Sequence, residues 1–124
     1  MEKWIYLIGG GIVGTVARYV LAGAVSVRAG ATFPWGTMAV NLIGCFVVGF
    51  LDIIFEKKFL LSPNYRILLM TGFCGAFTTF STLMLETSNL LKENEFLYAF
   101  GNVVISFGIG FIAFKLGAVI AELI

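Results

Sequence analysis

Apolar residues dominate the chain in four long stretches, which short polar segments separate. The stretches run from about residue 4 to 27, 35 to 55, 65 to 91 and 96 to 120. Because a bilayer core about 30 Å thick needs about 20 apolar residues per spanning helix, each stretch is long enough to cross a membrane as a helix. The pattern therefore predicts an all-α integral membrane protein, with four transmembrane helices in a single domain, residues 1–124.

The composition supports this prediction and excludes several functions. Hydrophobic residues make up 60% of the 124 residues and charged residues only 12%, with a mean hydropathy of +1.01. The net charge of +1 gives no positive surface for nucleic acid, so nucleic-acid binding is excluded. Two cysteines without metal-ligand spacing and the lack of histidine exclude a disulfide scaffold and histidine-based metal or acid–base chemistry.

The first apolar stretch is interpreted as a transmembrane helix and not as a cleaved signal peptide. It is longer than a signal-peptide core, it contains Arg18, and three further apolar stretches follow it. Five flanking lysines and arginines lie on the side of the termini and two on the other side, which favours cytoplasmic termini and leaves a mixed orientation open. The sequence thus predicts a multi-pass protein of the inner (plasma) membrane.

Arg18 and Asn41 lie within apolar stretches, where a polar group is expensive and usually faces a partner, a cavity or a pathway. Arg18 could concentrate anions in a water-filled vestibule, or it could bind backbone carbonyls as a structural arginine. Asn41 lies one helical turn after Thr37, and its neutral amide could donate to a partly dehydrated anion or to a neighbouring helix. The residues themselves leave both pairs of alternatives open.

The third stretch contains the densest polar signal, the segment GFCGAFTTFST at residues 72–82. Its two glycines weaken a helix, and its four hydroxyls can compete for backbone carbonyls. We expect the helix to break here near the middle of the membrane, where freed carbonyls could bind a small hard cation. The alternative is a kinked helix whose hydroxyls bond to its own carbonyls.

The fourth stretch carries a narrow face of small and weakly polar residues at three- and four-residue spacing. This face consists of Asn102, Ser106, Gly110, Ala113 and Gly117. Such faces most often mark close contacts between membrane helices, so we favour packing over a wetted pathway.

Three segments together resemble the Fluc (CrcB-type) family of fluoride ion channels. They are GGGIVGTVARY at residues 9–19, WGTMAVNLIG at residues 35–44, and the segment at residues 72–82. The resemblance covers the whole chain. It implies a passive channel, not an enzyme, that exports cytoplasmic fluoride across the lipid bilayer. It also implies an antiparallel, dual-topology dimer with two pores lined by both chains.

The resemblance also implies roles for individual residues. Arg18 resembles the vestibule arginine of the family, Asn41 its pore asparagine, and Phe80 the first of its two pore phenylalanines. The backbone carbonyls of Gly75 and Thr78, from both subunits, are expected to hold a structural sodium ion at the dimer interface. The expected hydroxyl-bearing lining consists of Thr37, Ser81, Thr82 and Ser106.

Two positions depart from the family pattern. Leu83 stands where the second pore phenylalanine is expected, so conduction could be slower or the second contact could come from elsewhere. Asn102 stands where a tyrosine is expected. The second subunit is expected to be another copy of this chain, although paired subunits from two genes exist in the family.

Three other functions compete with a fluoride channel. A small four-helix multidrug exporter would need a carboxylate in the first span, where this chain has Arg18. A non-transporting assembly subunit would use the small-residue faces only for packing. A membrane enzyme would need a clustered acid and base, whereas Asp52 and Glu86 lie near the ends of spans without an evident partner.

Overall fold

The computed structural model describes residues 1–58 and 62–124, and all regular structure in these ranges is helical. The first span is α1 (Glu2–Ala29), and the second is α2 (Trp35–Ile53) with the π-helical turn η1 (Ile54–Lys58). The third span combines α3 (Pro63–Arg66), the π-helix η2 (Ile67–Cys74), α4 (Gly75–Phe77) and α5 (Phe80–Lys92). The fourth span is α6 (Phe96–Leu123).

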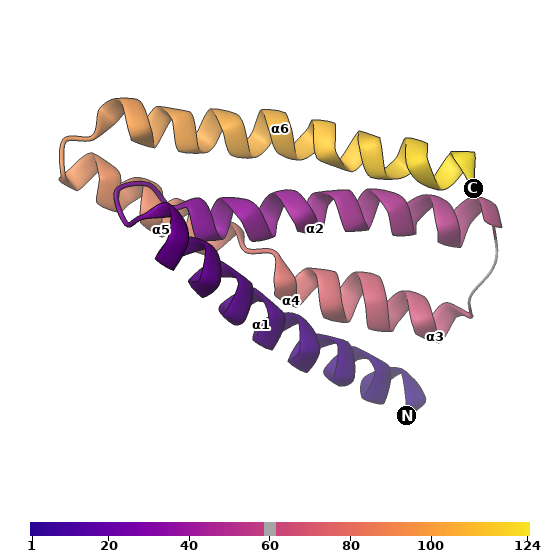
Figure 1. Ribbon diagram of the computed structural model, residues 1–124. Coiled ribbons are helices and arrows are strands. Elements are labelled where there is room, and N and C mark those ends of the chain that lie inside the picture. The colour runs from indigo at the N-terminus through magenta and orange to yellow at the C-terminus, as the bar shows by residue number, and fades with distance from the viewer. Residues whose placement is uncertain (59–61) are drawn as a thin grey trace.

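The described residues form four helical spans long and apolar enough to cross a membrane, as the sequence predicts. They run over Glu2–Ala29, Trp35–Lys57, Pro63–Lys92 and Phe96–Leu123. The expected all-α, multi-pass membrane fold is therefore confirmed. An even number of spans returns the chain to its starting side, and both termini lie at the same end of the bundle (Figure 1).

The α2 helix is the central element of the bundle. It runs alongside α6 over most of its length, while α1 crosses in front of the third span (Figure 1). In its most apolar part 39% of the residues are buried, against 11% in α1 and in α6. Because α2 contacts the other three spans, a polar side chain on it can reach each of them.

Glycines allow the backbones of neighbouring spans to approach closely. A Cβ atom at Gly117 of α6 would clash with the carbonyl of Phe46 on α2, and one at Gly49 of α2 would clash with the carbonyl of Phe114 on α6. Gly10 of α1 makes the same kind of approach to the carbonyl of Leu68. These contacts agree with the packing interpretation of the small-residue face.

The third span is broken at Thr78 and Thr79, which confirms the break expected within residues 72–82. Thr78 has φ −90° and ψ 157°, and Thr79 has φ −150° and ψ 121°, so both residues are extended between two helical segments. The break is visible as a non-helical link between α4 and α5 (Figure 1). It lies about halfway along the span, which is the arrangement that requires its backbone groups to be buried in protein or to line a cavity.

Candidate functional site

The new helix after the break begins with a side-chain cap. The Oγ1 atom of Thr79 accepts a hydrogen bond from the backbone N–H of Thr82 at 3.3 Å, and the Thr79 hydroxyl donates to the Thr82 hydroxyl at 3.1 Å. Threonine is a favoured N-cap residue because its oxygen satisfies an N–H that has no helical partner. The expected pore residue Thr82 therefore takes part in the start of α5.

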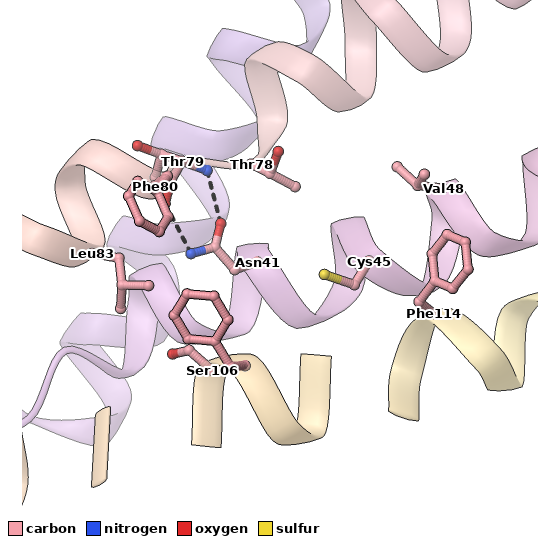
Figure 2. Close-up of a pocket in the computed structure, with 10 residues that line it drawn as sticks. Asn41, Cys45, Val48, Thr78, Thr79, Phe80, Leu83, Ser106 and Phe114 are labelled. Atoms are coloured by element: carbon pink, nitrogen blue, oxygen red, sulfur yellow. Dashed lines mark hydrogen bonds between the residues drawn. The ribbon is translucent and has the colours of Figure 1, made fainter. Parts of the chain in front are cut away.

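Asn41 of α2 binds the backbone of Thr79 within the break. Its Nδ2 donates to the Thr79 carbonyl at 3.0 Å, and its Oδ1 accepts from the Thr79 N–H at 2.8 Å (Figure 2). The amide thus supplies both partners that the extended residue lacks. Of the two alternatives left open by the sequence, a bond to a neighbouring helix is present. The second Nδ2 hydrogen is not used in this pair.

Arg18 reaches the same region from α1. Its Nε donates to the carbonyl of Ala76 at 3.0 Å, just before the break, and its side chain is half-buried. The structural alternative, in which the arginine binds a backbone carbonyl, is therefore realised. The contact uses one of the five N–H groups of the guanidinium, so a role in attracting anions remains compatible with it.

A cavity of about 310 Å³ opens beside the break. Its polar lining residues are Asn41, Thr78, Thr79 and Ser106, and Phe80 lies among them (Figure 2). The remaining lining is apolar or weakly polar, namely Cys45, Val48, Leu83, Phe107 and Phe114. The lining contains no ionisable acid or base other than the thiol, and its hydrogen-bonding groups are neutral amides, hydroxyls and backbone.

The structure brings together some of the expected site residues and separates others. Asn41, Phe80, Ser106 and Thr78 line the cavity. The remaining expected residues lie outside its lining, namely Arg18, Thr37, Gly75, Ser81 and Thr82. Ser81 is exposed on the surface of α5 next to the exposed Phe80. In the single chain, therefore, the expected hydroxyl lining does not form one continuous wall.

Phe107 provides an aromatic ring that the sequence analysis did not identify. It lines the cavity and packs against Phe80 in an edge-to-face arrangement, with ring centroids 6.2 Å apart and ring planes at 80°. Leu83, in the expected position of a second pore phenylalanine, is buried. Nothing distinguishes Phe107 among thirteen phenylalanines except that it directly follows Ser106.

Glu86 is a second residue whose partner the sequence did not reveal. The hydroxyl of Thr37 donates to its carboxylate, which joins α2 to α5. Glu86 also lines a second cavity of about 330 Å³, together with Asn89, Glu93 and the loop after α1. Since Thr37 gives its only hydroxyl hydrogen to Glu86, it donates no bond to another group in this conformation.

Asn102 is buried in the contact between α5 and α6, with a relative exposure of 1%. Its Nδ2 donates to the Thr87 hydroxyl at 3.0 Å, and that hydroxyl donates to the carbonyl of Leu83 at 2.7 Å. The Oδ1 of Asn102 and the Oγ of Ser106 are buried without a hydrogen-bond partner among the described residues. Asn102 therefore connects two helices and leaves one acceptor unsatisfied.

Comparison with known proteins identifies the family. The model of the family described as "CrcB-like protein, Camphor Resistance (CrcB)" matches residues 5–118. The chain belongs to the CrcB family. This match spans all four helices and includes both sides of the break, so it covers the site as well as the fold.

Curated relatives resemble the chain over nearly its full length. A protein of Chlorobaculum tepidum is 47% identical over 98% of this chain and 96% of its own length. One of Desulforapulum autotrophicum is 41% identical over 99% and 98%, and one of a Sulfurihydrogenibium species is 34% identical over the whole of both chains. All three are named "Fluoride-specific ion channel FluC". These names are those of ion channels and not of enzymes, in agreement with the resemblance drawn from the sequence.

Proposed function

We propose that this protein is a fluoride-selective channel through which cytoplasmic fluoride leaves the cell passively. The observation that carries the proposal is the position of the Asn41 amide, which lies in the wall of a neutral cavity beside a broken helix. The names of the CrcB relatives support fluoride as the ion.

The chemistry of the cavity suits a small, strongly hydrated anion. Fluoride in a narrow pore must exchange water for other hydrogen-bond donors, and a neutral donor binds it without trapping it. The Asn41 amide has one N–H not used by Thr79, and Ser106 is among the residues that line the same space. The rings of Phe80 and Phe107 add electropositive edges, which can face an anion.

Arg18 and the hydroxyls outside the cavity would serve the approach to it. A permanently charged guanidinium at a water-filled vestibule with low-dielectric walls raises the local concentration of anions. Thr37, Ser81 and Thr82 would extend the polar path beyond the cavity lining. In this proposal Thr37 releases Glu86 when it donates to the ion, because its one hydroxyl hydrogen cannot serve both.

We also propose that two copies of this chain form an antiparallel dimer in the inner (plasma) membrane of a prokaryote, with two pores. Phe80 is 62% exposed although it lines the cavity, so the single chain leaves the cavity open on this side. A second copy packed there would complete the wall.

A sodium ion is proposed as a structural cofactor at the centre of the dimer. Residues 1–58 and 62–124 contain no group of three cysteine, aspartate or glutamate side chains suited to a metal, and backbone oxygens are the proposed ligands. The carbonyls of Gly75, in the short helix before the break, and of Thr78, within it, have the hard oxygen character that such an ion needs. When bound, sodium would supply positive charge that holds the two broken helices together.

Reconstitution tests the proposal directly. Purified protein is placed in liposomes loaded with either fluoride or chloride, and ion-selective electrodes follow the release of each anion. We expect fast release of fluoride and retention of chloride. An equally slow leak of both anions would overturn the proposal and favour an assembly subunit, and proton-coupled efflux of an organic cation would favour a multidrug exporter.

A further inference from the structure

Two side chains at the break redirect the backbone N–H groups that would otherwise occupy the carbonyls of Gly75 and Thr78. In a continuous helix, the N–H of Thr79 would donate to the Gly75 carbonyl, four residues earlier. Here it donates to Asn41 Oδ1 at 2.8 Å. In the same way the N–H of Thr82, the helical donor for the Thr78 carbonyl, donates to Thr79 Oγ1 at 3.3 Å.

Three of the four carbonyls next to these two are engaged, namely those of Cys74, Ala76 and Thr79. The Cys74 carbonyl accepts from both the N–H and the hydroxyl of Thr78, each at 3.0 Å. The Ala76 carbonyl accepts from Arg18 Nε at 3.0 Å, and the Thr79 carbonyl accepts from Asn41 Nδ2 at 3.0 Å. The break is therefore a selective arrangement, in which particular oxygens are held by side chains and others lose their helical donors.

We infer that Asn41 and Thr79 are positioning residues for the cation site, because they keep the Gly75 and Thr78 carbonyls free to bind the ion. The inference rests on the sodium site of the proposed function. A carbonyl already bonded to an N–H is a poorer ligand, since the cation must compete with that bond. Asn41 accepts the N–H that would otherwise bond to the Gly75 carbonyl. The Thr79 hydroxyl accepts the N–H that would otherwise bond to the Thr78 carbonyl.

The surroundings leave room for such a ligand set. Gly75 is exposed, and a Cβ atom built on it would have a single neighbour within 4 Å, the Met70 carbonyl oxygen at 4.0 Å. The surface beside this residue is thus open to an ion or to a second copy of the chain. Asn41 lies in the cavity lining as well, so one side chain joins the proposed anion path to the proposed cation site.

Thr79→Val tests the inference because valine keeps the shape of threonine and removes the Oγ1 acceptor. The N–H of Thr82 then has no cap, which favours extension of α5 back through Thr79, so that this N–H donates to the Thr78 carbonyl. The thermal unfolding midpoint of the purified protein in detergent is measured against sodium concentration, with N-methylglucamine holding the ionic strength constant. In Thr79→Val we expect the sodium concentration that gives half of the maximal rise in the unfolding midpoint to be about tenfold higher than in the wild type. The reason is that the ion must first displace the hydrogen bond between the Thr82 N–H and the Thr78 carbonyl in each subunit.

Two matched variants separate this effect from a general loss of stability. Thr79→Ser keeps the acceptor and is expected to restore the wild-type sodium dependence. Thr87→Val removes a hydroxyl on the same helix whose bonds are to the Leu83 carbonyl and to Asn102, not to Thr79 or Thr82. It is expected to lower the unfolding midpoint by the same amount at every sodium concentration.

The possible results distinguish this inference from the proposal on which it rests. A wild-type sodium midpoint in Thr79→Val would overturn the inference. Should that variant fail to fold, Asn41→Leu tests the Gly75 carbonyl in the same assay, and an unchanged sodium midpoint there would equally overturn it. A wild-type protein that sodium does not stabilise would instead remove the cation site itself, a result visible without any variant.

Discussion

The ring of Phe107 meets the ring of Phe80 edge-to-face, with centroids 6.2 Å apart. The two residues come from α6 and α5, and both line the cavity beside the break. A second aromatic ring is therefore present next to Phe80 although Leu83 occupies the expected position. This contact favours the alternative in which the second aromatic contact comes from elsewhere in the fold.

Phe107→Ala is predicted to slow fluoride efflux by about tenfold, because it removes one ring edge from the cavity and frees the other to rotate. Fluoride-selective electrodes on proteoliposomes give the rate. Phe111→Ala is the matched control, since Phe111 is also exposed on α6 and stacks on Phe114 instead. Equal rates in the two variants would remove Phe107 from the conduction path.

Asn41→Asp is predicted to reduce fluoride efflux by about a hundredfold or more, because a negative charge about 4 Å from the passing anion repels it strongly in a low-dielectric site. Aspartate can still accept the Thr79 N–H, so the variant is expected to elute at the wild-type volume on size-exclusion chromatography. Asn64→Asp adds the same charge at a partly exposed position next to Glu2, outside the cavity lining, and is expected to conduct normally. Undiminished efflux through Asn41→Asp would contradict a role for Asn41 in the pore.

Gly117→Ala is predicted to destabilise the protein by about 1–3 kcal/mol, because the added methyl group overlaps the Phe46 carbonyl and forces α6 away from α2. Gly108→Ala on the same helix is the control, since a Cβ atom there meets nothing within 4 Å. Thermal unfolding in detergent compares the two. Similar midpoints would show that the close approach of α2 and α6 is dispensable.

Asn102→Leu is predicted to change stability by no more than about 1 kcal/mol. The substitution gives up one bond to Thr87, worth about 0.6–2 kcal/mol in membranes, but it also removes the unsatisfied Oδ1. Asn102→Ala, which leaves a cavity as well, is expected to cost about 2 kcal/mol more. Thermal unfolding measures both, and a large loss in Asn102→Leu alone would show that the buried oxygen has a partner such as a bound water.

The sequence by itself determined the features that depend on local composition. The lengths of the apolar stretches predict the four spans, which the structure confirms. The glycines and hydroxyls at residues 72–82 predict the break, because they weaken the helix at the place where they occur. The family resemblance likewise came from short segments and is confirmed by the family match over residues 5–118.

Only the tertiary structure decided which polar groups meet. Asn41 and Thr79 are 38 residues apart, Thr37 and Glu86 are 49 apart, and Arg18 and Ala76 are 58 apart. No local pattern encodes such pairs, since each depends on how α1 and α2 pack against the broken third span. The position of the Phe107 ring in the cavity lining could not be predicted from the sequence for the same reason. In an apolar chain many phenylalanines are equivalent in sequence, and the packing of α6 alone selects the one that faces the cavity.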